Sequence, residues 1–297
     1  MEIIFLGTAH SIPTPSRSHT AIWFSHEDEN ILIDCGEGTQ RQIKKAGINP
    51  CKLTKILISH WHGDHILGIP GLLQTLALNN YSKTLKIYGP KGTKRYMDML
   101  LNMFIFVGSI NIEIIELTNG KFFENKSIEI TSQEVKHGRH ALAYAIKEKD
   151  KLNINIDKLK KLGIKPGPHL RDLKEGKNIR FNKKVIKAKE YTTFRKGKKI
   201  SIILDTSYLE ILAKFAKDSD VIIAESTYAS DMNNKAKEYD HLTAQQAATI
   251  AKKAKTKQLY LTHISQRYEH NENLILKEAK KVFKDTKLAE DFMKIKF

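Results

Sequence analysis

Short apolar runs alternate with amphipathic segments along most of the chain. The runs are rich in Ile, Leu and Val and are bounded by Gly, Asn, Asp or Lys, a pattern typical of β-strands. We predict strands at Glu2–Leu6, Ile31–Asp34, Lys55–Ser59, Leu85–Tyr88, Ile112–Leu117, Ile128–Val135, Leu142–Ile146, Val185–Ala188, Ile200–Leu204, Val221–Ala224 and Gln258–Leu261. Apolar residues at helical spacing predict helices at Gly38–Ala46, Ile66–Leu78, Gly92–Met103, Leu209–Ala216, Ala244–Ala254 and Glu272–Phe283. The alternation predicts an α/β fold of stacked sheets flanked by helices.

Length and composition exclude several classes of protein. The chain has 297 residues, of which 41% are hydrophobic, so disorder is disfavoured. No apolar run approaches the roughly 20 residues that span a bilayer, and the first residues lack the pattern of a signal peptide. Two cysteines, Cys35 and Cys51, cannot build a disulfide framework. We therefore expect a cytoplasmic protein with no membrane partner.

The positive charge is concentrated in one segment. The whole chain carries 50 Lys and Arg against 33 Asp and Glu, a net charge of +17. Residues Lys147 to Lys199 hold 19 of these cations and 6 of the anions, a net charge of +13. Solvated lysines would explain the composition alone, but the concentration in one segment favours contact with a nucleic acid. Gly163-Ile164-Lys165-Pro166-Gly167-Pro168 interrupts this segment, which has little apolar periodicity and is predicted to be an excursion from the core.

A cluster of metal-ligand side chains follows one predicted strand. The sequence Ser59-His60-Trp61-His62-Gly63-Asp64-His65 comes directly after an apolar strand and before an apolar helix. Histidines two residues apart in an extended segment point to the same side. Imidazole and carboxylate groups are ligands for zinc, and four such groups in six residues suit a site for two ions. A histidine-rich surface loop is the alternative, and this spacing makes it improbable.

Distant residues are needed to complete two metal sites. His137, Asp205 and His263 each follow a predicted strand, where α/β sheets place functional groups. Each has an ordinary explanation too: His137 competes with His10 and His140, Asp205 could cap the next helix, and His263 could merely end a strand. Together with the first cluster the three residues make seven ligands.

These motifs resemble those of the metallo-β-lactamase superfamily, and more narrowly of the tRNase Z family of tRNA 3′-processing endonucleases in its short form. The similarity extends from Phe5 to about Tyr268. It includes Leu32–Gln40, Gly63–Leu73 and Leu261–Tyr268, and also Leu162–Pro168, which resembles the Gly/Pro motif of that family's flexible arm. Other hydrolases of the superfamily lack this arm. The sequence differs from the family at Ala143 and Leu204, where glycine is usual.

The resemblance implies a fold, a cofactor and roles for the site residues. It implies an αββα sandwich and two Zn²⁺ ions. His60, His62 and His137 would hold one ion, Asp64, His65 and His263 would hold the other, and Asp205 would bridge them. Asp64 would also orient the attacking water. His241 would donate a proton to the leaving group, and Glu225 would orient His241. Spacing alone favours a different interpretation of His241, as an ordinary residue before a helix cap. For Glu225 the alternative is a buried carboxylate at a strand end that forms a structural pair.

The resemblance also implies the substrate and how it is held. The chain is expected to remove the 3′ trailer from precursor tRNA, leaving a 3′-hydroxyl on the tRNA. A single domain over residues 1–297 would carry an inserted arm at 148–184, and Gly163, Pro166, Gly167 and Pro168 would contact the tRNA. Arg17 is the one cation kept in a loop that is basic in many relatives, so it is a further candidate for substrate binding. In the family the arm works across a dimer, so we expect a homodimer.

Three other functions remain open at this stage. A lactonase, sulfatase or small phosphodiesterase of the same fold would share all seven ligands but would not need the arm. A non-catalytic RNA-binding protein would be expected to have lost ligands, and none is lost here. A β-CASP-type RNA nuclease would need a large inserted domain, for which the chain is too short.

Overall fold

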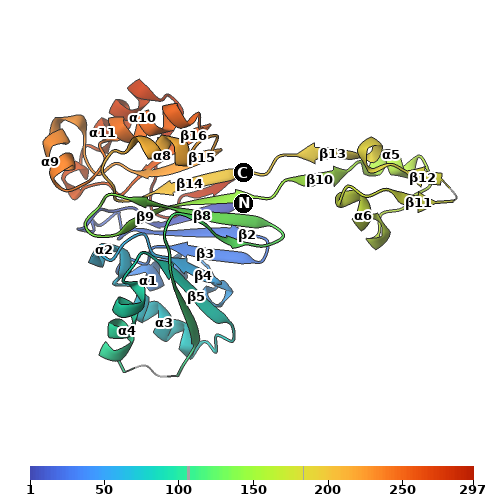
Figure 1. Cartoon of the computed structure of the whole chain (residues 1–297). Helices are drawn as coiled ribbons and strands as arrows, with labels where there is room; N and C mark the ends of the chain where they lie inside the picture. The colour runs from blue at the N-terminus through green and yellow to red at the C-terminus, as the bar shows by residue number, and fades with distance from the viewer. Residues whose placement is uncertain (106–107, 183) are drawn as a thin grey trace. The chain divides into compact units, whose positions relative to one another are not determined.

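The computed structural model describes residues 1–105, 108–182 and 184–297 (Figure 1). The chain forms two compact units, which are described separately. The core unit comprises Met1–Ile146 and Lys199–Phe297, and the arm unit comprises Lys147–Lys198. Within the described ranges, no helix is both long enough and apolar enough to span a bilayer.

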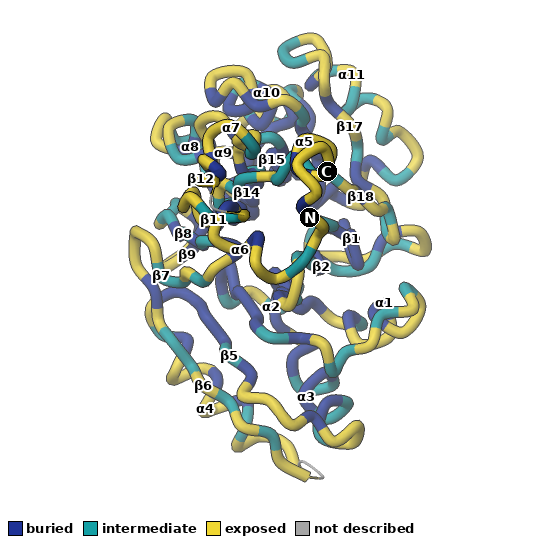
Figure 2. The backbone as a smooth tube through the Cα atoms, turned by 90° about the vertical axis from the view of Figure 1, so that its right-hand side faces the viewer, coloured by how far each residue is buried: buried dark blue, intermediate teal, exposed yellow. Residues whose placement is uncertain are grey.

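The core unit contains two seven-stranded sheets. The order in the first is β18 (Lys294–Lys296), β1 (Glu2–Gly7), β2 (Ala21–His26), β3 (Glu29–Ile33), β4 (Lys55–Leu57), β5 (Thr84–Gly89) and β6 (Asn111–Glu116). Strands β18 to β3 pair antiparallel, whereas β3 to β6 pair parallel. In Figure 2 the inner strand β5 is largely buried, while the edge strand β6 alternates between intermediate and exposed residues.

The second sheet has a parallel half and an antiparallel edge. Its order is β17 (Thr286–Leu288), β16 (Gln258–Thr262), β15 (Val221–Glu225), β14 (Lys199–Ile203), β9 (Ala141–Glu148), β8 (Ile128–Val135) and β7 (Gly120–Glu124). Strands β14 to β17 run parallel, so their carboxyl ends meet at one edge of the sheet. That edge carries the candidate site.

Alternating side chains of the strands make a layered sandwich. Ile3 and Phe5 of β1 pack with Ile200 and Ile202 of β14 in the apolar layer between the sheets. The intervening Ile4 faces the opposite way, as the two-residue period of a strand requires. Helices α1 (Thr39–Lys45), α3 (Ile69–Leu78) and α4 (Thr93–Met103) cover the first sheet, and α8 (Glu210–Phe215), α10 (Ala244–Ala254) and α11 (Glu272–Val282) cover the second (Figure 1). The predicted αββα sandwich is confirmed.

Several predicted elements differ from the observed ones. The helix expected at Ile66–Leu78 is two helices, α2 (Gly63–Ile66) and α3, because the chain turns at Gly68 and restarts with Pro70 in the first turn. Strand β2 was not predicted, although its residues are mostly buried. The remaining short elements of the core are α9 (Asn233–Glu238) and 3₁₀ turns at Pro50–Lys52, Ser230–Met232 and Gln266–Tyr268.

The arm unit has an apolar cluster of its own. It consists of β10 (Lys151–Ile154), α5 (Ile156–Lys160), a 3₁₀ turn at Pro168–Leu170, α6 (Arg171–Lys174), β11 (Ile179–Phe181), β12 (Lys184–Ile186), α7 (Ala188–Tyr191) and β13 (Thr192–Arg195). Strand β10 pairs with β13, and β11 with β12. Leu159, Ile164 and Leu173 are buried in this unit. The strand predicted at Val185–Ala188 was partly wrong, since Ala188 begins a helix.

Candidate metal centre

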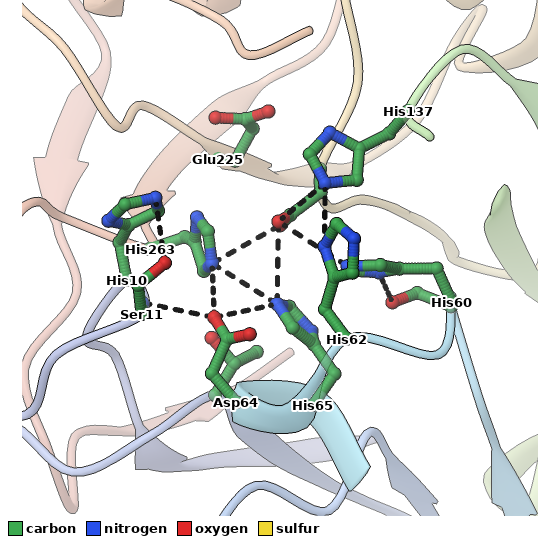
Figure 3. Close-up of polar contacts among 12 residues, drawn as sticks. His10, Ser11, His60, His62, Asp64, His65, His137, Glu225 and His263 are labelled. Carbon is green, nitrogen blue, oxygen red and sulfur yellow. Dashed lines mark hydrogen bonds and ion pairs between the residues drawn. The ribbon is translucent and has the colours of Figure 1, made fainter. Parts of the chain in front are cut away.

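The seven predicted ligands converge at the carboxyl ends of the strands. His60 and His62 lie in the loop after β4, and Asp64 and His65 occupy the first turn of α2. His137 follows β8, Asp205 follows β14 and His263 follows β16. Figure 3 shows the side chains of Asp64, His65, His137 and His263 pointing toward one another from these separate elements. The sheets thus assemble residues up to two hundred positions apart in the sequence.

The histidines form two groups around Asp205. His60, His62 and His137 make one group, in which Nδ1 of His62 lies 3.1 Å from Nε2 of His137. Asp64, His65 and His263 make the other, in which the Nε2 atoms of His65 and His263 lie 3.2 Å apart.

Asp205 faces both groups. Its Oδ2 atom lies 3.6 Å from Nε2 of His137 and 3.4 Å from Nε2 of His65. Its Oδ1 atom lies 3.3 Å from Nε2 of His263. One carboxylate therefore offers an oxygen to each group.

The donor atoms fit divalent metal ions. Ligands about 2.0–2.1 Å from a tetrahedral zinc ion stand roughly 3.3 Å apart, close to the spacings of 3.1 Å and 3.2 Å found within the two groups. Nε2 of His60 and Oδ1 of Asp205 are buried and have no hydrogen-bond partner among the residues that the structure describes. Buried polar atoms are nearly always paired, so these two atoms call for a ligand.

Neighbouring histidines keep the two carboxylates of the site ionised. Burial alone would raise the pKa of Asp205, but His263, His65 and His60 outweigh it and hold that pKa well below its usual value. Hydrogen bonds from His263 and His65 likewise lower the pKa of Asp64 against the effect of burial. Burial and the neighbouring His65 hold the pKa of His60 well below its usual value, so His60 is neutral. Anionic carboxylates beside a neutral imidazole are what a cation requires.

Residues around the site orient the ligands, and the sequence analysis missed them. Asp34 accepts hydrogen bonds from Nδ1 of His65 at 2.6 Å and from the hydroxyl of Ser59 at 2.6 Å. The hydroxyl of Thr227 lies 3.0 Å from Nδ1 of His263. Such bonds fix each ring so that its Nε2 faces the other proposed ligands. Asp34 belongs to the segment Leu32–Gln40, which resembles the family. No pattern in the neighbouring residues indicated that its side chain would contact His65.

His241 and Glu225 form a buried pair beside the ligands. Nδ1 of His241 lies 3.1 Å from Oε1 of Glu225, and both side chains are at most 6% exposed. Burial would lower the pKa of His241, but Glu225 outweighs it and raises this pKa to about 9. Glu225 also accepts hydrogen bonds from the backbone N–H of Thr206 and the hydroxyl of Thr227. Thr243, not His241, caps α10, through a capping box with Gln246.

His10 is a further residue of this region that the sequence analysis did not assign. It was named only as a competitor of His137. Its ring packs edge-on against the rings of His241 and His263, with centroids 5.0 Å and 4.9 Å apart. Burial and the neighbouring His263 lower its pKa to about 3. The next residue, Ser11, donates its backbone N–H to Oδ2 of Asp64 at 3.0 Å. This loop therefore walls one side of the site.

Arg17 does not have the expected role. Its side chain is buried and forms a bidentate ion pair with Glu272. Its Nη1 atom donates a hydrogen bond to the backbone carbonyl of Ala289 at 2.7 Å. A guanidinium engaged in this way has no free face for a phosphate, so Arg17 holds its loop to the C-terminal segments and is withdrawn as a substrate-binding residue.

The other predicted substrate-binding residues lie in the arm unit. Gly163 follows α5 with a backbone φ of +75°, a conformation that favours glycine. Pro166, Gly167 and Pro168 line a hollow of this unit together with Ile154 and Lys174. They form a local surface of the arm.

A family model matches the first half of the chain, and relatives of known family match nearly all of it. Residues 1–161, just over half of the chain, match the model of the family described as Anti-Pycsar protein Apyc1. A ribonuclease Z of Methanothermobacter thermautotrophicus is 39% identical over 296 residues, which cover 99% of this chain and 96% of that protein. A ribonuclease Z of Bacillus cereus is 37% identical over 299 residues, covering 98% of this chain and 97% of that protein.

Solved structures give the same result. The crystal structure of human tRNase Z, short form, superposes with a TM-score of 0.73 at 27% identity, covering 100% of this chain and 99% of that chain. The metallo-β-lactamase fold protein YhfI from Bacillus subtilis, at 20% identity, has a TM-score of 0.72 over 99% of this chain and 98% of that chain, which shows the fold alone. The chain therefore has the metallo-β-lactamase fold and belongs to the ribonuclease Z family, with the Apyc1 family model describing its N-terminal half.

Proposed function

We propose that this protein is a metal-dependent endoribonuclease that removes the 3′ trailer from precursor tRNA and leaves a 3′-hydroxyl on the tRNA. The observation that carries the proposal is the convergence of seven metal-ligand side chains in a chain that matches ribonuclease Z relatives over nearly its full length. The match extends through the arm segment, which a hydrolase of small substrates would not need.

The proposed cofactor is a pair of Zn²⁺ ions. His60, His62 and His137 would hold one ion, Asp64, His65 and His263 the other, and Asp205 would bridge them. When bound, two such ions polarise the phosphate and supply a water molecule of lowered pKa at neutral pH. The unpartnered buried atoms of His60 and Asp205 support this donor set.

The chain's own residues would orient the water and protonate the leaving group. Asp64 accepts a hydrogen bond from the N–H of Ser11, which fixes its carboxylate, and it would orient the attacking water. Glu225 accepts from Nδ1 of His241, so Nε2–H is left to face the substrate. His241 would give that proton to the 3′ oxygen of the tRNA as the P–O bond breaks, and the new phosphate would remain on the trailer.

The arm unit would bind the body of the tRNA. The segment from Lys147 to Lys199 carries a net charge of +13, which suits the RNA backbone. Phosphate contacts fix position without reading sequence, and duplex RNA is recognised mainly by shape. Gly163 and Pro166–Pro168 would shape the contact surface.

We further propose that the protein forms a homodimer. Sedimentation of the free protein tests this proposal, and a monomer at all concentrations would count against it. The cytoplasmic location stays a prediction.

One assay tests the proposed activity. The protein is incubated with zinc and a precursor tRNA carrying a 3′ trailer, and the ends of both products are analysed. A tRNA with a 3′-hydroxyl and a trailer with a 5′-phosphate are expected. The His60→Ala variant is the control and should be inactive. Hydrolysis of bis(p-nitrophenyl) phosphate without any cleavage of the precursor would favour the small-substrate phosphodiesterase instead.

A further inference from the structure

A cleft adjoins the metal centre on the side of His60, His62 and His137. These three residues form its inner wall. Its outer wall combines three cations with two aromatic rings, and we call it the α4 cleft. Its defining residues are Trp61, Lys91, Arg95, Tyr96 and Arg139.

The elements of the site itself place these residues. Trp61 stands between the proposed ligands His60 and His62, and Arg139 comes two residues after His137. Lys91 lies two residues before α4, and Arg95 and Tyr96 lie in the first turn of this helix. Whatever binds in the α4 cleft therefore lies next to the proposed ligands His60, His62 and His137.

The two aromatic rings form a fixed platform. The indole N–H of Trp61 donates to the hydroxyl of Thr93 at 2.9 Å, and that hydroxyl donates to the carbonyl of Pro90 at 2.7 Å. The rings of Trp61 and Tyr96 pack with centroids 5.1 Å apart. Tyr96 is nevertheless 37% exposed, so part of its ring surface is open to a ligand.

The cations of the cleft are not neutralised by the protein. Within the described ranges, Lys91, Arg95 and Arg139 are exposed and none forms an ion pair with a carboxylate. The nearby Glu116 instead accepts the backbone N–H groups of Gly92 and Lys94, at 2.9 Å and 3.0 Å. The N-terminus of α4 is therefore already occupied, and the side-chain cations are left for an external anion.

We propose that the α4 cleft binds the single-stranded RNA that flanks the scissile phosphate. A base would stack on Tyr96 and Trp61, and Arg95, Arg139 and Lys91 would bind the adjoining phosphates. Aromatic platforms beside cations are the general way in which proteins hold single strands without reading their sequence. This inference rests on the proposed function, and it assigns a subsite to that activity. The strand is either the trailer or the unpaired 3′ end of the tRNA.

Precursors with one-nucleotide and ten-nucleotide trailers distinguish these two sources. The Arg95→Ala/Arg139→Ala double variant and Tyr96→Ala are compared with Lys94→Ala, which removes an exposed cation of α4 outside the cleft. A loss of kcat/KM confined to the long trailer assigns the cleft to the trailer. Equal losses on both substrates assign it to the tRNA 3′ end. Unchanged kcat/KM on both substrates would overturn the proposal.

Binding of a labelled six-nucleotide oligouridine separates this inference from the proposed function. We expect Tyr96→Ala to weaken binding by about 5- to 100-fold, the usual effect of losing one stacked base. The double variant should reduce the log–log salt slope by about 1.4, for two phosphate contacts on a single strand. The zinc content and the melting temperature should stay unchanged in all variants, which shows that the variants fold. Failure of the wild type to cleave any precursor would refute the function but not the cleft, whereas equal oligouridine binding by all variants, or none by the wild type, would refute the cleft.

Discussion

Each ligand histidine has to present one particular nitrogen to the site, and neighbouring groups decide which. For His65 that group is Asp34, whose carboxylate accepts from Nδ1 and leaves Nε2 free. Asp34 and His263 both adopt a left-handed backbone, with φ of 56° and 58°. Such conformations are uncommon for residues other than glycine and concentrate at functional sites. The backbone is therefore strained at the proposed ligand His263 and at Asp34, which orients His65.

The first prediction concerns this orienting carboxylate. The Asp34→Asn variant keeps a residue that tolerates a left-handed backbone but removes the charge beside His65. We expect zinc affinity to fall by about 10- to 100-fold, the usual effect of losing such a partner. Competition with a chromophoric chelator measures it, and Asp28→Asn, an exposed change, is the control. Equal affinity in both variants would show that Asp34 only supports the fold.

The second prediction concerns the proton donor. The His241→Ala variant removes the group that Glu225 holds in place but removes none of the seven ligands. We expect zinc content to be unchanged and the single-turnover rate to fall by about 10²- to 10⁴-fold, the usual contribution of a positioned acid. Metal analysis and single-turnover cleavage of a precursor tRNA measure the two effects. A parallel loss of zinc would make His241 a ligand.

At the scale of elements, the sequence predicted the local patterns well and missed several residues whose roles depend on contacts across the fold. The cluster from His60 to His65 and the helix α10 are recognisable because each is one continuous stretch of sequence. Strand β18 has three residues and depends on pairing with β1, so no local pattern could reveal it. Likewise Asp34, Thr227 and His10 gain their roles from contacts across the fold. The resemblance, not spacing, identified His241, because a residue before a helix cap is ordinary.

The third prediction concerns Gly68, which lies in the turn between α2 and α3. A Cβ added at Gly68 would overlap the backbone carbonyl oxygen of Gly36, which cannot move aside easily. The Gly68→Ala variant should therefore unfold at a lower temperature, with a loss of about 1–3 kcal/mol typical of overpacking. Gly71→Ala is the matched control, because its Cβ would meet only the flexible side chain of Gln40. Thermal unfolding measures the melting temperatures of both variants. Equal melting temperatures would contradict the prediction.

At the scale of the whole molecule, chemistry and charge lie in different units. The core unit holds all seven proposed ligands, whereas the arm unit contains most of the net positive charge and has its own apolar cluster around Leu159, Ile164 and Leu173. The elements of the arm are only three to five residues long, too short for a helical or strand period to be visible in the sequence. This explains why the segment shows little apolar periodicity in the sequence.

The fourth prediction follows from this separation. Lys160, Lys161 and Lys165 are exposed in the arm unit, and Lys277, Lys280 and Lys281 are exposed on helix α11 of the core unit. Replacing either trio by Gln removes the same charge. The arm variant should bind precursor tRNA more weakly, and its log–log salt slope should fall by up to about 2.7, or 0.9 for each duplex phosphate that the protein no longer neutralises. The α11 variant should change neither, and hydrolysis of bis(p-nitrophenyl) phosphate should be the same in both. Equal weakening by the two trios would mean that net charge alone attracts the RNA, and the arm would then have no specific part in binding.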